Sequence, residues 1–220
     1  MKTGSFGALL VVLMTISTAH AQQSANPPSA KQMEPPSMNS RLGTTSIEAY
    51  PQFADGKLYA CVVEFNALAR DETYRQGGFM KVGGSFGLMT AKGNVAVTLK
   101  IIVHDIDLAT GTFTPSAPAN GYFVFGNETS KASLVATYPS DVPGAHFAVF
   151  KIEPTFAKLA AAIDARKLTF AFNRKDGDAD IRVPIDLTVK DTDANGRKTF
   201  SKQMVFEFYQ CAGDLLKSLR

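Results

Sequence analysis

The feature that most constrains the fold is a series of short runs rich in β-branched and aromatic residues. Gly, Pro, Asn or Ser residues bound most of the runs, as expected for strands that end in turns. The runs are 58–65, 95–106, 122–125, 134–138, 146–152, 168–172, 181–189 and 199–208. Such spacing predicts a mainly β fold, an antiparallel β-sandwich or barrel-like domain of about eight to nine strands.

Two segments have helical rather than strand periodicity. A helix is predicted at about 154–166, inserted between late strands, because Pro154 suits a first helical turn and apolar residues follow at helical spacing. A second helix is predicted at about 211–219, where Cys211 and Leu215 are spaced four apart. The chain is therefore expected to end in a helix that packs on the strands.

Cysteine occurs at two positions, Cys61 and Cys211, near the two ends of the predicted folded region. Alternation in the run 58–65 places Cys61 on the buried face of its strand. In an oxidising compartment an even number of cysteines favours a disulfide, and the alternative is a pair of buried free thiols. We predict a Cys61–Cys211 disulfide that joins the last helix to the first predicted strand.

Residues 1–21 have the pattern of a signal peptide. Lys2 precedes the apolar segment 6–16, and Ala19-His20-Ala21 is a small-x-small cleavage site. The apolar segment is shorter than the roughly 20 residues that a membrane-spanning helix needs. The sequence therefore predicts an exported protein, periplasmic or extracellular, without a transmembrane segment in the mature chain.

The rest of the chain divides into a tail and one domain. Residues 22–46 are rich in Pro, Ser and Gln, with few large apolar side chains, and are expected to form a disordered tail. Residues 47–220 are expected to form a single β-rich domain, since a chain of this length can bury one hydrophobic core.

The charge pattern bears on possible partners. The chain has 23 Lys and Arg against 20 Asp and Glu, a formal net charge of +3. Basic residues alternate with acidic ones, as in Arg70-Asp71-Glu72, so no basic stripe could follow a phosphate backbone. Nucleic acid is not an expected partner.

The segment Gly83-Gly84-Ser85-Phe86-Gly87 matches the G-x-S-x-G pattern of serine hydrolases. Asp141 and His146 follow in the chain order of a catalytic triad. However, that motif requires a helix directly after the serine, and here a β-rich run follows. Glycines at this density are also typical of a bulged or bent strand, so a hydrolase that uses Ser85 is kept as an alternative.

Two acidic turns suggest a calcium site. The segment 191–196 reproduces the first six positions of a calcium-binding loop, but the twelfth position is Lys202 instead of a glutamate. A second acidic turn occupies 176–180, and a plain β-hairpin tip explains Asn195-Gly196 equally well. The candidate calcium ligands are Asp176, Asp178, Asp180, Asp191, Asp193 and Asn195.

The expected function follows mainly from the compartment and the fold class. Edges and loop tips of β-sandwiches commonly bind other molecules. The sequence therefore favours an exported non-enzymatic binding or envelope-associated module whose partner it does not identify. The alternatives are the serine hydrolase and a calcium-stabilised adhesion module, with calcium as the possible cofactor.

Overall fold

The computed structural model describes residues 38–91, 93–140 and 142–219, and all of its sheets are antiparallel. The predicted signal peptide and the tail up to residue 37 lie outside these residues. The strand β1 begins at Gly43, inside the segment predicted as tail, after a short 3-10 helix at Met38–Arg41.

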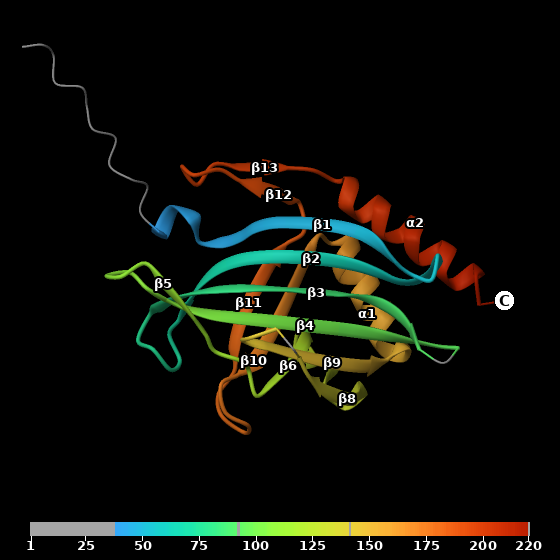
Figure 1. The fold of residues 1–220 in the computed structure, drawn as a ribbon, viewed down its shortest axis with the longest axis horizontal. Helices are drawn as coiled ribbons and strands as arrows, with labels where there is room; N and C mark the ends of the chain where they lie inside the picture. The colour runs from blue at the N-terminus through green and yellow to red at the C-terminus, as the bar shows by residue number, and fades with distance from the viewer. Residues whose placement is uncertain (1–37, 92, 141, 220) are drawn as a thin grey trace, which may run out of the picture. The chain divides into compact units, whose positions relative to one another are not determined.

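The larger sheet has seven strands, most of them long (Figure 1). They are β1 (Gly43–Ala54), β2 (Lys57–Asp71), β3 (Gly78–Ala91), β4 (Asn94–Asp107), β5 (Thr112–Pro115), β8 (Leu134–Pro139) and β9 (Ala145–Lys151). Their order is β1-β2-β3-β4-β9-β8, and β5 pairs with β4. The sheet is open at its edges, so the barrel-like alternative does not apply.

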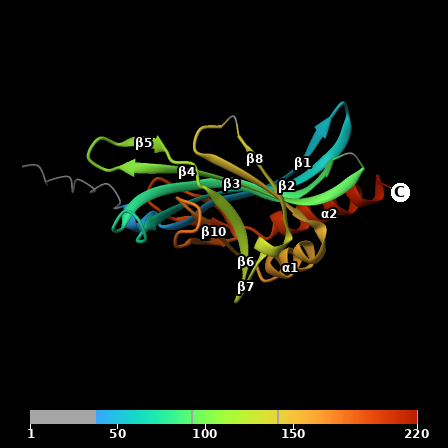
Figure 2. The same cartoon turned by 90° about the horizontal axis from the view of Figure 1, so that it is seen from below.

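The remaining elements form two smaller sheets and two α-helices. The four-stranded sheet has the order β11-β10-β6-β7, and β12 pairs with β13. The bounds are β6 (Asn120–Phe125), β7 (Glu128–Thr129), a 3-10 helix (Ser130–Ser133), α1 (Ile152–Asp164), β10 (Lys167–Asn173), β11 (Ile181–Asp186), β12 (Val189–Thr192), β13 (Lys198–Phe200) and α2 (Gln203–Lys217). Figure 2 shows β6, β10 and both α-helices on one side of the large sheet.

The predicted mainly β fold with an inserted and a C-terminal helix is confirmed, but one boundary is wrong. The C-terminal helix begins at Gln203, so the second half of the run 199–208 is helical and not a strand. Met204, Phe208 and Cys211 are buried, whereas Phe206 is 69 % exposed. Burial thus recurs every three to four residues, as in an amphipathic helix, and the alternating aromatic residues gave a misleading strand signal.

Aromatic side chains fill the space between the two larger sheets. The rings of Phe65 and Phe170 stack at 4.5 Å between centroids, and Phe86 meets Phe123 edge-on at 6.3 Å. These four side chains are fully buried. We call the side of the seven-stranded sheet that carries Phe65 and Phe86 its inner face.

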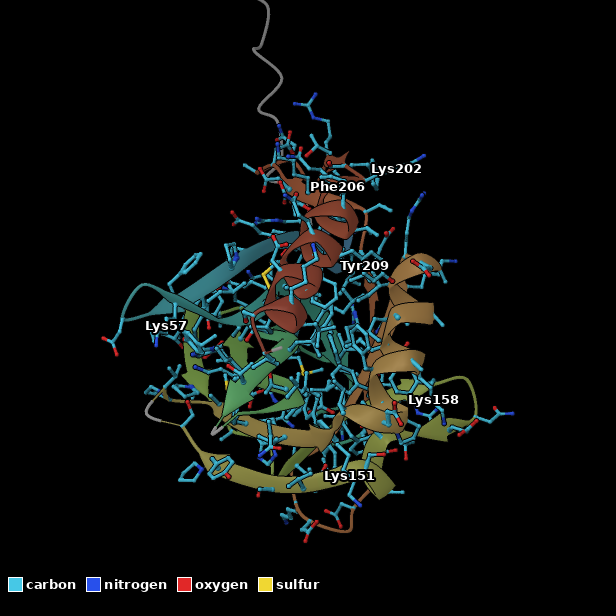
Figure 3. All side chains as sticks on the ribbon, turned by 90° about the vertical axis from the view of Figure 1, so that its right-hand side faces the viewer. Lys57, Lys151, Lys158, Lys202, Phe206 and Tyr209 are labelled. Atoms are coloured by element: carbon cyan, nitrogen blue, oxygen red, sulfur yellow. A yellow bond between two sulfur atoms is a disulfide. The ribbon has the colours of Figure 1, made fainter. Side chains whose placement is uncertain are left out.

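The two helices lie together over one end of the inner face. Leu159 and Ile163 of α1 and Leu215 of α2 are fully buried. The hydroxyl of Tyr209 donates to the carbonyl oxygen of Ala160 at 3.1 Å and so ties α2 to α1 (Figure 3).

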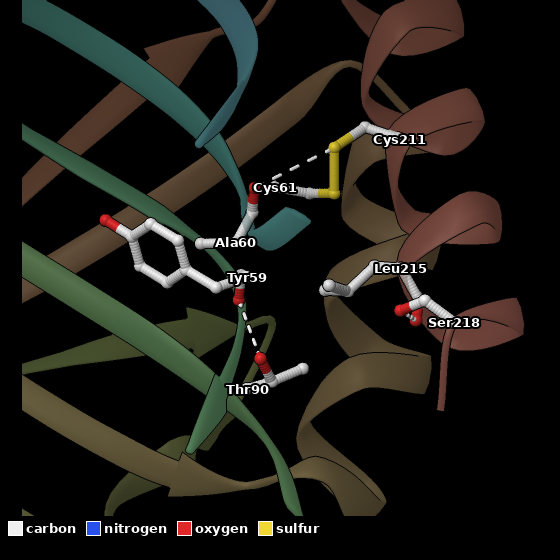
Figure 4. The surroundings of a disulfide bond; sticks show 7 residues. All are labelled: Tyr59, Ala60, Cys61, Thr90, Cys211, Leu215 and Ser218. Carbon is white, nitrogen blue, oxygen red and sulfur yellow. Dashed lines mark hydrogen bonds between the residues drawn. A yellow bond between two sulfur atoms is a disulfide. The ribbon is translucent and has the colours of Figure 1, made fainter. Parts of the chain in front are cut away.

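The predicted disulfide is confirmed. Cys61 on β2 and Cys211 on α2 are bonded, with 5.7 Å between their Cα atoms and a sequence separation of 150 (Figure 4). Both cysteines are buried. The bond fixes the C-terminal helix to the second strand, and it is consistent with an oxidising compartment.

A cluster of charged side chains around the buried Asp71 closes the opposite end of the inner face. The guanidinium of Arg174 contacts Asp71 at 2.6 Å and Asp105 at 2.7 Å, and its Nη1 donates to the Ser116 hydroxyl. Arg75 also pairs with Asp105 at 3.0 Å. The Asp71 side chain is 0 % exposed, so this network neutralises a carboxylate that has no access to water.

No helix among the described residues combines the length and the apolar character needed to cross a membrane.

Candidate functional site

The glycine-rich motif lies within a long bent strand, β3. An added Cβ at Gly84 would lie 1.9 Å from the carbonyl oxygen of Lys100, and one at Gly87 would lie 1.9 Å from that of Cys61. The pairing of β3 with β2 and β4 nevertheless continues without a register shift. The glycines therefore let β3 bend closely against both neighbours without a bulge.

The face of the large sheet opposite the inner face is hollowed, and we call this hollow the outer trough. Figure 2 shows both α-helices on the other side of the sheet. The trough has a volume of about 550 Å³. Its described lining residues are Tyr50, Gln52, Val62, Glu64, Asn66, Lys81, Gly83, Gly84, Ser85, Met89, Thr98, Lys100, Ile102, His104, Pro139, Ser140, Val142 and Phe147.

The floor of the outer trough is formed by β3, and its walls stand on the neighbouring strands. We call three residues that lie opposite one another on β2, β3 and β4 a rung. The rungs whose side chains point outward are Leu68–Lys81–His104, Asn66–Gly83–Ile102, Glu64–Ser85–Lys100, Val62–Gly87–Thr98 and Ala60–Met89–Ala96. Three small residues, Gly83, Ser85 and Gly87, thus follow one another at alternate positions. Because larger side chains flank them on most rungs, the small residues form a channel along β3.

Polarity changes along this channel. The rungs at Lys81 and Ser85 contain Lys100, His104 and Glu64. The rungs at Gly87 and Met89 contain no charged residue. Val62 and Thr98, beside Gly87, are only 7 % and 6 % exposed although they point away from the main core. The trough therefore has a charged half and an uncharged half.

The acidic and basic residues of the charged half differ in whether they form side-chain hydrogen bonds. The Tyr50 hydroxyl donates to Glu64 at 3.0 Å, and burial, with this hydrogen bond and the charge of Glu64, raises the pKa of Tyr50 to about 12. Lys81 and Lys100 have no hydrogen bond or ion pair within the described part of the chain. Among the described residues, the trough thus holds two cations without an ion pair and one acid that is hydrogen-bonded to a neutral hydroxyl.

The structure separates Ser85 from His146. Ser85 on β3 lies opposite Lys100 on β4, and its side chain faces the outer trough. His146 on β9 lies opposite the buried Ile101 on β4, and its side chain faces the inner side. Burial lowers the pKa of His146, and its buried Nε2 atom has no hydrogen-bond partner among the described residues. Asp141 lies outside the described residues. Ser85 and His146 are therefore on opposite faces of one sheet.

The two acidic turns are also separate from each other. In Figure 1 the β12–β13 turn lies beside β1 at the upper edge, and the orange turn between β10 and β11 lies at the lower edge. The two turns therefore do not lie side by side in this view. Across the described ranges, no three His, Cys, Asp or Glu side chains are grouped as metal ligands.

Both turns use their carboxylates for internal contacts. Asp193 accepts hydrogen bonds from the backbone N–H groups of Asn195 and Arg197 and from the Arg197 side chain, which together lower its pKa. Asp180 accepts from the Asn173 side chain at 2.8 Å. These contacts are those of stable turns.

The outer trough was not predicted from the sequence. Lys100 and His104 interrupt an apolar run, and the small residues of β3 alternate at a spacing of two. Both signals are present in the sequence, but they indicate a trough only when β3 is known to lie between β2 and β4. The G-x-S-x-G pattern predicted Ser85 as a possible nucleophile and not as part of a trough floor.

Comparison with known proteins gives no relative for this chain. No family model matches it, and neither does a curated protein or a solved structure. Its function must therefore be argued from its own residues.

Proposed function

We propose that the protein is an exported, non-enzymatic binding module that holds an elongated, partly apolar ligand in the outer trough. One observation carries the proposal: Gly83 and Ser85 line the floor along β3, and larger side chains of β2 and β4 flank them. The volume of about 550 Å³ is within the range of small-molecule sites. A channel along a strand suits a ligand that is long and narrow.

The predicted signal peptide and the disulfide support the exported location. Disulfides persist in oxidising compartments and are rare in the cytosol. The Cys61–Cys211 bond joins β2, which forms one wall of the trough, to α2. Oxidation after export would therefore stabilise the strand that carries this wall.

Binding is favoured over hydrolysis by the surroundings of Ser85. A serine nucleophile needs a general base within hydrogen-bond reach. His146 faces the other side of the sheet, and the Ser85 hydroxyl has no hydrogen bond within the described residues. Ser85 is better suited to form part of the floor than to attack a substrate.

The proposal is tested with N-phenyl-1-naphthylamine, a neutral apolar dye that fluoresces when it leaves water. Wild-type protein is expected to bind the dye saturably. The Ser85→Trp variant fills the floor and is expected to lose this binding. The matched control, Ser218→Trp, places the same side chain at the exposed end of α2 and is expected to bind normally.

Circular dichroism and thermal melting establish that both variants are folded. Saturable binding that survives in folded Ser85→Trp protein would show that the dye binds elsewhere. Absence of saturable binding to the wild type would also count against the proposed function.

A further inference from the structure

We infer that the ligand of the outer trough is a single-chain amphiphile with an anionic head group, such as a fatty carboxylate. This inference rests on the proposed function and adds the chemical class of the ligand. The head group would lie in the charged half of the trough, beside Lys100, with Lys81 farther along β3 in the same half. The apolar chain would follow β3 toward Met89.

The sign of the head group follows from the unpaired charges. Lys100 is half-buried at the centre of the trough, between Ser85 and Phe147 in the register of the sheet. It has no anionic partner among the described residues. Partial burial of an unpaired ammonium costs free energy, and a bound anion would remove that cost.

The neighbouring groups add to the positive character of this half. Lys81 lies four residues from Ser85 along β3, about 13 Å at the usual rise of a strand. His104 on β4 lies opposite Lys81 in the strand register and adds a polar ring to this half. Glu64 is the one acidic residue among the described lining residues, so the two lysines leave this half with an excess of positive charge.

The uncharged half explains why the ligand needs an apolar chain. Val62, Gly87 and Thr98 form one rung, and Met89 lies on the next. From Ser85 to Met89 the strand again extends about 13 Å, which is long enough for several methylene groups. Burial of apolar surface there would supply affinity, and the lysines would select the head group.

The experiment compares three ligands that share a ten-carbon chain: decanoate, 1-decanol and decylammonium. Each displaces the neutral dye at concentrations below self-association. Wild-type protein is expected to bind decanoate about tenfold or more tightly than decanol, the size expected for a hydrogen bond to a charged group. Decylammonium is expected to bind more weakly than decanol.

Variants assign the selectivity to Lys100. The Lys100→Met substitution keeps an unbranched side chain one atom shorter and removes the charge, so decanoate affinity should fall about tenfold while decanol affinity stays unchanged. The matched control is Lys57→Met, at the exposed start of β2 and outside the lining of the trough. It should leave the affinities for both ligands unchanged.

The outcomes separate this inference from the proposed function. If decanoate and decanol displace the dye from the wild type equally well, and folded Ser85→Trp protein binds no dye, the trough is a binding site but the anionic head group is wrong. If neither decanoate nor decanol displaces the dye from the wild type, the inference of an amphiphilic ligand is overturned. Binding only to vesicles of anionic phospholipid, without displacement by decanoate, would also overturn it and assign this face to membrane contact.

Discussion

The two faces of the seven-stranded sheet differ in whether Arg174, on one face, and Lys81 and Lys100, on the other, form ion pairs. On the inner face, Arg174 is held between Asp71 and Asp105 by contacts of 2.6 and 2.7 Å. On the outer face, Lys81 and Lys100 have no partner within the described residues. The fold thus satisfies the charges that stabilise it and leaves cations available where a ligand is proposed to bind. Removal of a charge on the inner face should therefore change stability, and removal of a trough lysine should change ligand binding.

The largest effect on stability is expected from loss of the disulfide. Replacing Cys61 and Cys211 together by Ala opens a loop of 150 residues. In the chain-entropy model this lowers the free energy of unfolding by up to about 5 kcal/mol. Urea unfolding of oxidised wild-type and variant protein measures the difference. An unchanged midpoint and slope would show that the bond contributes little to stability.

Removal of the Arg174 guanidinium, which pairs with the buried Asp71, should have the next largest effect. Arg174→Met leaves the fully buried Asp71 without its counter-charge, which is expected to cost about 3–5 kcal/mol. The matched control is Arg197→Met, because the Arg197 side chain pairs with Asp193 but is 80 % exposed. It should change stability by less than about 1 kcal/mol. Equal losses in the two variants would contradict the distinction between buried and exposed pairs.

The bend of β3 is tested by adding a single methyl group. Gly87→Ala forces its Cβ against the carbonyl oxygen of Cys61 and is expected to cost about 1–3 kcal/mol. Gly213→Ala, in α2 with no neighbour within 4 Å, should instead stabilise by about 0.5–1 kcal/mol. Thermal melting compares the two variants. A neutral Gly87→Ala variant would show that β3 does not need this close approach.

The charge at Lys100 should have almost no effect on the stability of the ligand-free protein. Lys100→Met removes an unpaired, half-buried cation, so the free energy of unfolding should change by less than about 0.5 kcal/mol or increase slightly. Urea unfolding without ligand measures it. A loss comparable to that of Arg174→Met would mean that Lys100 belongs to the stabilising interactions of the fold.

The smallest expected effect is the pH dependence contributed by His146. Burial lowers its pKa in the folded protein, so the unfolded chain binds more protons once the pH falls below the ordinary histidine value of about 6.5. Stability should therefore be complete above that pH and fall between it and the lower folded pKa. His146→Gln, which does not titrate, should show a flatter profile from pH 7.5 to 5.5. Identical profiles would contradict the burial effect.

Much of the inner face could be predicted from the sequence, and the outer face could not. Alternation of apolar residues in 58–65 placed Cys61 in the core, because burial selects one face of a strand. The same criterion gave a wrong prediction at 203–208. There Phe206 and Phe208 have the alternating spacing of a strand, although the segment is helical. The helix is favoured by packing of Met204 and Cys211 against the sheet, which is a tertiary effect.

The trough depends on which strands are neighbours, and a single sequence does not give strand order. Glu64, Ser85 and Lys100 form one rung although they are widely spaced along the chain. The polar residues on this rung also resemble any solvent-exposed strand positions. The G-x-S-x-G match pointed to the correct strand, but its glycines serve to bend β3 and its serine forms part of the trough floor.

The most direct test of the account uses the methionines of β3 as reporters of the two faces. Met89 lines the outer trough, whereas Met80 on the same strand and Met204 on α2 are buried on the inner side. With methyl-¹³C-methionine protein, NMR titration with decanoate is predicted to shift the Met89 signal and leave those of Met80 and Met204 in place. A shift of Met80 or Met204 with Met89 unchanged would contradict the account.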